Sequence, residues 1–131
     1  MDKIDIELNI VSLFNLNYRT NAQKAVLAVG GNAYHEFDLY EHDRVIGGIT
    51  TSPWKNRTKS RSSNTGGQDR ASTELLWLSL WTGNESRIMI LTDKEMADKL
   101  FKRWHGCMFP QKIKILYCEL AERRFEEIGV L

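Results

Sequence analysis

The hydrophobic positions along the chain change their spacing several times, and each change predicts a new helix or strand. Residues 4–16 repeat apolar side chains at helical spacing. Residues 22–29 form a short apolar run that ends at a pair of glycines, which predicts a second helix, with a strand over 24–29 as the alternative. The start of the chain is therefore expected to hold one long helix and one short element of either kind.

The next two segments, 33–40 and 45–51, show the alternation of a β-hairpin around the polar turn 41–44. Side chains of a strand point alternately to its two faces. With a turn of odd length, the apolar side chains Phe37 and Leu39 would share the core face. The opposite face would then collect Glu36, Asp38, Gly48 and Thr50.

Residues 52–69 break every periodicity and are rich in serine, asparagine, threonine and glycine. Loops of this length in small domains are usually functional or mobile, so we expect a mobile loop here. Regular patterns resume after it, and Asp93 is placed to cap a helix. These patterns predict helices over 70–81, 94–105 and 121–131, and strands over 87–91 and 112–120.

The order of these elements predicts an α/β fold. The hairpin strands must be antiparallel, and the strands joined through the helix 94–105 should be parallel. The fold class is then a mixed sheet flanked by helices. A chain of 131 residues can bury a core, and neither side of the 52–69 loop has enough elements for a domain of its own. We therefore expect a single domain over residues 1–131.

Charge adds one local feature to this picture. The net charge is +1, so the total indicates no particular partner. Segment 55–70 nevertheless holds five basic residues and one acidic residue, a local +4, which leaves −3 for the rest of the chain. Cations among serine, threonine and asparagine donors are suited to nucleic-acid phosphates. The residues expected to bind nucleic acid are Lys55, Arg57, Lys59, Arg61 and Arg70.

Other features bear on location. No apolar run approaches the roughly 20 residues of a membrane span, and the N-terminal segment is charged and alternating, unlike a secretory signal. Cys107 and Cys118 fit neither a metal-binding spacing nor a dense disulfide framework. We therefore expect reduced thiols, a cytoplasmic location and no membrane partner.

Asp38 is the residue of the hairpin that most needs an explanation. Aspartate is a poor strand former, and a carboxylate is costly to remove from water without a partner. Its partner could be a backbone N–H, a cation such as Arg70, or a metal ion. The sequence leaves these three alternatives open.

The stretch from Gly30 through Phe37-Asp38-Leu39 to Ile46–Thr51, with the helix and strand that follow, resembles the restriction-endonuclease-like, or PD-(D/E)XK, nuclease superfamily. The resemblance covers roughly residues 20–120. The superfamily has an αβββαβ core, and its motif is an Asp on one strand followed by Glu-X-Lys on the next. In this chain the Asp falls on Asp38, the Glu on Gly48 and the Lys on Thr50.

The resemblance implies a metal-dependent nuclease site in which two motif positions are degenerate. In such enzymes two carboxylates hold a divalent cation, Mg²⁺ or Mn²⁺, and the Lys orients the attacking water. Gly48 supplies no ligand and Thr50 carries no charge. A relocated site would bind metal through Asp38 and Glu36, with Glu74 or Glu7 as other sources of the second carboxylate. Lys55 or Gln68 could then orient the water, and His35 or His42 could act as a base.

Three functions follow as alternatives. The first is a catalytically degenerate protein that binds nucleic acid, or DNA in particular, or acts as an accessory within a larger DNA-processing complex. The second is an active metal-dependent endonuclease with the relocated site. The third is a protein-interaction domain or homodimer with no nucleic-acid role, for which the acidic residues near the C-terminus would provide a surface.

Overall fold

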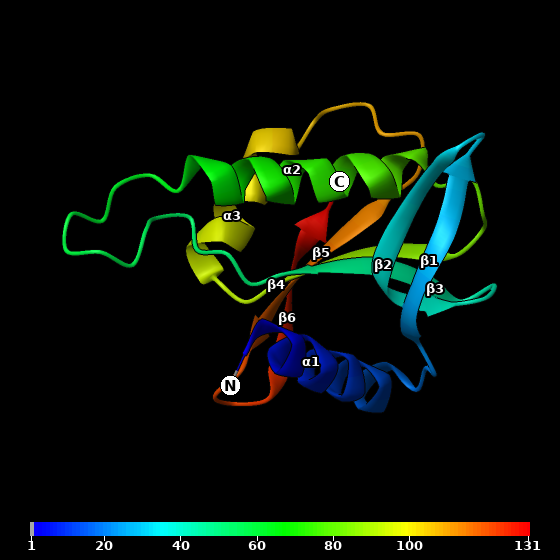
Figure 1. Ribbon diagram of the computed structural model, residues 1–131, viewed down its shortest axis with the longest axis horizontal. Helices are drawn as coiled ribbons and strands as arrows, with labels where there is room; N and C mark the ends of the chain where they lie inside the picture. The colour runs from blue at the N-terminus through cyan, green and yellow to red at the C-terminus, as the bar shows by residue number, and fades with distance from the viewer. Residues whose placement is uncertain (1) are drawn as a thin grey trace.

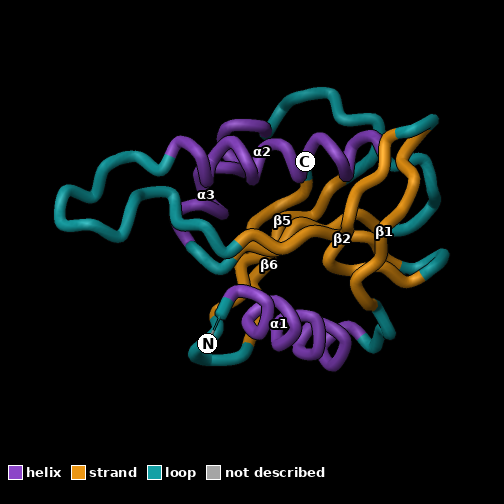
Figure 2. The backbone as a smooth tube through the Cα atoms, in the orientation of Figure 1, coloured by secondary structure: helices purple, strands orange, loops and turns teal. Residues whose placement is uncertain are grey.

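The computed structural model describes residues 2–131 as a six-stranded mixed sheet with helices on both faces (Figure 1). Helix α1 covers one face, and helices α2 and α3 cover the other (Figure 2). The predicted α/β class with a mixed sheet flanked by helices is confirmed. The elements are α1 (Lys3–Tyr18), β1 (Gln23–Gly30), β2 (Ala33–Glu41), β3 (Val45–Thr50), α2 (Thr65–Leu80), β4 (Ser86–Leu91), α3 (Lys94–Trp104), β5 (Ile113–Glu119) and β6 (Arg124–Val130).

The strands lie in the sheet in the order in which they occur in the sequence, from β1 to β6. The first three pair antiparallel, as short turns require. Strand β3 pairs parallel with β4, and β4 with β5, because α2 and α3 carry the chain back between them. The last strand, β6, runs antiparallel to β5. The predicted antiparallel hairpin and parallel β4–β5 pair are both confirmed.

The two faces of the sheet bury separate hydrophobic clusters. On one face Ile10, Leu13 and Phe14 of α1 pack against the sheet. On the other face the residues of α2 and α3, among them Leu78 and Leu100, form the larger cluster. The central strands β3 and β4 are buried on both sides, which explains why they read as near-continuous apolar runs.

Strand β2 contains a bulge at Asp38 and Leu39. One residue lies between Gln23 and Ala25 on β1, but two residues lie between their partners Tyr40 and Phe37 on β2. The extra residue reverses the alternation, so Phe37 packs with the α2 side and Leu39 with the α1 side. The prediction that Phe37 and Leu39 share one face is therefore wrong, because it assumed an uninterrupted strand.

Two predicted helices are strands. Residues 22–29 belong to β1, which was the alternative prediction, and the predicted terminal helix 121–131 is replaced by β6. At the latter site Arg123 adopts a left-handed conformation with φ 54° and donates its N–H to Leu120 O, which reverses the chain. Partly buried side chains of β6, including Phe125 and Ile128, then complete the two clusters.

Helix α2 begins several residues before the predicted start at 70. Its N-cap is Asn64, whose side chain accepts a hydrogen bond from the Gly67 N–H. Gly66 and Gly67 are poor helix formers, so the sequence pattern alone favoured a loop. A Cβ on Gly67 would lie 2.9 Å from Ser52 Cβ, so the close packing against Ser52 requires glycine there.

Both cysteines, Cys107 and Cys118, are free thiols. Burial raises the pKa of the Cys118 thiol to about 11, which keeps it protonated and unreactive at neutral pH. Within residues 2–131, every helix falls short of the length and apolar character needed to cross a membrane.

Candidate functional site

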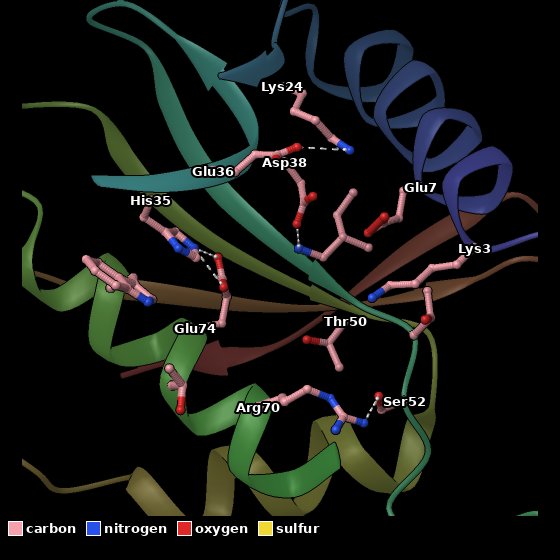
Figure 3. A pocket seen from close by; sticks show the side chains of 14 residues that line it. Lys3, Glu7, Lys24, His35, Glu36, Asp38, Thr50, Ser52, Arg70 and Glu74 are labelled. Atoms are coloured by element: carbon pink, nitrogen blue, oxygen red, sulfur yellow. Dashed lines mark hydrogen bonds and ion pairs between the residues drawn. The ribbon is translucent and has the colours of Figure 1, made fainter. Parts of the chain in front are cut away.

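A pocket of about 430 Å³ opens where β2 and β3 separate, between α1 and α2 (Figure 3). Regular pairing of these strands ends at Leu39 and Gly47, and the chains diverge beyond that point. The pocket collects charged or titratable side chains from four elements, α1, β1, β2 and α2, some of which lie far apart in the sequence. These are Lys3, Glu7, Lys24, His35, Glu36, Asp38, Arg70 and Glu74.

Asp38 lies at the point where the two strands part. Its Oδ2 accepts a hydrogen bond of 2.8 Å from the Ile49 N–H, so its carboxylate takes up a backbone donor that has left the strand pairing. Burial raises the pKa of Asp38, the Ile49 N–H opposes this, and the carboxylates of Glu74 and Glu36 add to the increase. The N–H partner is therefore one of the three alternatives that the sequence left open, while Arg70 lies against Ser52 instead.

Glu74 of α2 occupies the space that Gly48 leaves empty. A Cβ built on Gly48 would lie 2.5 Å from Glu74 Cγ and 2.7 Å from Cδ, and closer still to Oε1. The Glu74 carboxylate also lies 3.0 Å from His35 Nε2, and the His35 ring stacks on Trp77 at 4.6 Å between centroids. Burial raises the pKa of Glu74, and His35 opposes this increase. The second carboxylate near Asp38 thus comes from a helix rather than from β3.

Glu7 is a third acidic group in the pocket, contributed by α1, and only 8% of the residue is exposed. Burial raises the pKa of Glu7 and the charge of Asp38 raises it further, while Lys3 and Lys24 oppose the increase. Carboxylates from α1, β2 and α2 therefore repel one another in one partly dry space. Their repulsion favours either protonation of a carboxyl group or binding of a cation between them.

Two lysines supply positive charge to the same pocket. Lys24 of β1 lies 3.3 Å from Glu36, and Figure 3 shows Lys3 of α1 directed into the cavity. Burial opposes the charge of Lys24, but Glu36, Glu7 and Asp38 outweigh it and raise the pKa of Lys24. Neither lysine lies in a recognisable motif, so the sequence alone does not identify them as pocket residues.

The acidic residues predicted from sequence are thus brought together to different degrees. Asp38, Glu74 and Glu7 are partly or fully buried in the pocket, whereas the Glu36 side chain is 53% exposed and paired with Lys24. The exposed pairing makes Glu36 less suited to ligate a metal than Glu74. The expected common face of Glu36 and Gly48 is not formed, since the Gly48 position meets α2 and Glu36 approaches Glu7 of α1.

Gln68 and Lys55 do not line this pocket. The residue Gln68 is 5% exposed, and its Nε2 donates to Trp54 O at 2.8 Å and to Ser63 Oγ at 2.9 Å. Lys55 Nζ lies 3.7 Å from Glu95 of α3. Both side chains hold the 51–64 loop in place, and neither lies where it would orient a water beside Asp38.

The other predicted nucleic-acid-binding residues divide into two groups. Arg57, Lys59 and Arg61 are exposed on the loop, which extends away from the sheet in Figure 1. Arg70 of α2 lines the pocket next to Ser52. The loop residues and the pocket are therefore neighbours through Arg70 and Ser52.

A second acidic group lies at the turn end of the β2–β3 hairpin. Among residues 2–131, His42, Asp43 and Glu85 form the only group of three or more His, Cys, Asp and Glu side chains whose ligand atoms all lie within 4.8 Å of one another. Glu85 is 3% exposed and accepts hydrogen bonds from Trp81 Nε1, the Asp43 N–H and Tyr40 OH. Burial favours protonation of Glu85, but these donors prevail and lower its pKa. We interpret this group as a structural network.

The donor chemistry of the pocket fits a hard divalent cation, because carboxylate oxygens are the ligands that Mg²⁺ and Mn²⁺ prefer. The oxygens of Glu7, Asp38 and Glu74 are spread around the cavity rather than gathered in a closed cage. The site therefore leaves room for water or for substrate oxygens beside a cation. Comparison with protein-family models, with curated proteins and with solved structures finds no match to this chain.

Proposed function

We propose that this protein is a divalent-metal-dependent phosphodiester hydrolase with a restriction-endonuclease-like core and a relocated second carboxylate. The order α1-β1-β2-β3-α2-β4 supports this proposal, as does the position of Asp38 at the divergence of β2 and β3. The observation that carries the proposal is the position of Glu74. Its side chain occupies the space that a side chain at position 48 would fill. A carboxylate therefore faces Asp38 despite the degenerate strand motif.

In this proposal the carboxylates of Asp38 and Glu74 would hold Mg²⁺ or Mn²⁺, with Glu7 as a further acidic group of the same pocket. A bound cation would polarise the phosphate and help a water to ionise. Burial raises the pKa of all three carboxyl groups and neighbouring carboxylates add to the increase, whereas a cation would favour the ionised forms. Compensation by a cation gives a physical reason for placing three acidic groups in one pocket.

The remaining pocket residues would serve the substrate. Lys24 and Lys3 provide the positive charge that Thr50 cannot, and they face the phosphate position from β1 and α1. Arg70 lies at the pocket edge, where it can contact an adjacent phosphate. His35, held by its stacking on Trp77, orients the Glu74 carboxylate.

The test is incubation of the purified protein with labelled DNA and Mg²⁺ or Mn²⁺. Asp38→Asn and Glu74→Gln should each reduce cleavage by about 100-fold or more, as expected for loss of a group that stabilises the transition-state charge. Glu36→Gln is the matched control and should retain most of the activity. Cleavage that is indifferent to Asp38→Asn would refute the proposal, because contaminating nucleases do not depend on this residue.

The second candidate is the catalytically degenerate protein that binds nucleic acid or serves a larger DNA-processing complex. The observation in its favour is that His35 already engages both oxygens of Glu74, while Thr50 leaves the motif without its lysine. DNA binding without cleavage in either metal would support this candidate. The homodimer or protein-interaction alternative stays a prediction, which a measurement of size in solution would test.

A further inference from the structure

The loop after β3 is a structured hairpin rather than an irregular segment. Across residues 54–64, named here the basic hairpin, Asn56 N donates to Ser62 O at 2.7 Å and Asn64 N donates to Trp54 O at 2.9 Å. Between these bonds, Lys55 and Ser63 form an antiparallel bridge. The two sides of the loop therefore pair with each other as they leave the body of the protein.

The base of the basic hairpin is fixed to α3. The Trp54 N–H donates to Asp93 Oδ2 at 3.0 Å, and the same oxygen caps α3 by accepting the Met96 N–H at 2.9 Å. On the other side of the base, Asn64 Nδ2 donates to Pro53 O at 2.9 Å. Since the base is held by partly buried hydrogen bonds to α3 and Asn64, the direction of the hairpin is set by the fold.

The tip of the basic hairpin carries positive charge without compensation. Arg57, Lys59 and Arg61 are exposed, and no carboxylate in residues 2–131 lies within ion-pair distance of them. Lys55, nearer the base, differs because it pairs with Glu95. Like charges on one short hairpin repel one another, and an external polyanion would remove that repulsion.

Helix α3 extends this positive surface. Its exposed residues Lys99, Lys102 and Arg103 follow the three- and four-residue spacing of one helix face, and of these Lys99 also pairs with Glu95 at 3.6 Å. Two of them reach the hairpin, since Lys99 Nζ lies 5.5 Å and the Arg103 guanidinium carbon 5.0 Å from the centroid of the Trp54 ring. Lys102 and Arg103 lie in the last turn of α3, where basic residues interact favourably with the helix dipole. This interaction explains their presence on the helix, but it does not explain the basic residues at the tip of the hairpin.

We propose that the basic hairpin and this face of α3 form one docking surface for the phosphate backbone of a nucleic acid, centred on Trp54. Residues 55–63 contain no apolar side chain, so the hairpin is unsuited to insertion into a membrane, whereas its amide and hydroxyl groups can donate to phosphates. Ser52 and Arg70 connect the base of the hairpin to the acidic pocket. This inference rests on the proposed function, because it identifies how the substrate would approach that pocket.

The experiment measures binding separately from catalysis. Fluorescently labelled duplex and single-stranded DNA are titrated with the protein in EDTA at several salt concentrations. Three variants each remove two charges: Arg57→Gln with Arg61→Gln on the tip, Lys102→Gln with Arg103→Gln on α3, and, as the control, Lys112→Gln with Lys114→Gln at the start of β5, at the opposite ends of the parallel strands. Thermal unfolding checks that all three variants fold.

The tip and α3 variants should each weaken DNA binding by about 10-fold at moderate salt and reduce the slope of log affinity against log salt by about 2. The control should bind within about twofold of the wild type. Equal losses in all three variants, or no loss in the first two, would overturn the docking surface. The docking surface would also be overturned if the protein bound phosphatidylserine vesicles but not DNA, and if the tip and α3 substitutions weakened that vesicle binding. Binding in EDTA requires no bound cation, so the losses in the tip and α3 variants can be measured whether or not the protein cleaves DNA.

Discussion

The two ends of the β2–β3 hairpin adjoin buried or partly buried carboxylates whose pKa values are shifted in opposite directions. At the turn end the pKa of Glu85 is lowered, although this residue is almost fully buried. At the open end the pKa values of Asp38 and Glu74 are raised. Burial favours protonation at both ends, so burial alone does not explain the difference.

The number of donors explains it. Glu85 accepts hydrogen bonds from an indole N–H, a backbone N–H and a tyrosine hydroxyl. Asp38 has one backbone N–H, and Glu74 has one imidazole nitrogen, while each also faces other carboxylates. We interpret a carboxylate that accepts several hydrogen bonds from the protein as structural. A carboxylate that accepts few hydrogen bonds has oxygen lone pairs left to bind a cation.

Among the substitutions that test this difference, Glu85→Ala should change the free energy of unfolding most. Glu85→Ala would leave the Trp81 indole N–H and the Asp43 backbone N–H without their acceptor in a buried site. We expect the free energy of unfolding to fall by about 3 kcal/mol, the usual cost of two unsatisfied buried donors. Urea denaturation would measure it. Glu85→Gln keeps one acceptor oxygen and should cost less, so an equal loss in both variants would contradict the donor explanation.

The next effect has the opposite sign. Asp38→Asn should increase the free energy of unfolding at neutral pH by roughly 1 kcal/mol, because it removes a poorly served buried charge. The folded pKa of Asp38 is raised, so between its ordinary value of 3.8 and the raised value the folded state binds more protons than the unfolded state. Wild-type stability therefore falls as pH rises through this window, and the advantage of the variant should grow across it and vanish below about pH 4.

Divalent cations provide the control for that prediction. Millimolar Mg²⁺ or Mn²⁺ should stabilise the wild type, since a ligand of the folded state raises its stability, and should affect Asp38→Asn far less. Thermal unfolding with and without metal measures the stabilisation of the wild type and of Asp38→Asn. If Asp38→Asn is less stable than the wild type at neutral pH in the absence of metal, and metal stabilises neither protein, Asp38 is structural like Glu85.

The two glycines of β3 test how firmly the Glu74 side chain is held. A Cβ on Gly47 would lie 2.5 Å from the backbone oxygen of Ile88, whereas a Cβ on Gly48 meets only the flexible side chain of Glu74. We expect Gly47→Ala to cost about 2 kcal/mol and Gly48→Ala less than about 1 kcal/mol, because Glu74 can move and β4 cannot. Urea denaturation would compare them. Equal costs would mean that Glu74 is held as rigidly as the strand.

The sequence was sufficient for the parts of the fold that depend on local periodicity. The α/β class, the antiparallel hairpin and the cap at Asp93 follow from spacing and capping chemistry, and the structure has all three. Strands β1 and β6 were harder to predict, because they are edge strands whose mixed patterns also suit a helix. Helix α2 was placed too late, because glycines at its start are tolerated only through contacts with Asn64 and Ser52.

The site shows the same division. Asp38 could be identified because an acidic residue within a strand needs a partner. Glu74, on the helix after the loop, was one of the residues predicted to supply a second carboxylate. The roles of Lys24 and Lys3 could not be predicted, since they depend on β1 and α1 packing across the pocket from α2. Gln68 and Lys55 looked suitable from sequence proximity, but tertiary contacts direct them to Trp54 and Glu95.

The bulge in β2 has a consequence for how the gene can change. One additional residue allows a single strand to supply Phe37 to one core and Leu39 to the other, with Asp38 between them at the pocket. Substitutions along the strand alter individual contacts, but loss of one codon there would exchange the faces of every residue on one side of the gap. The number of residues between Phe37 and Tyr40 should therefore vary less among descendants of this chain than their identities.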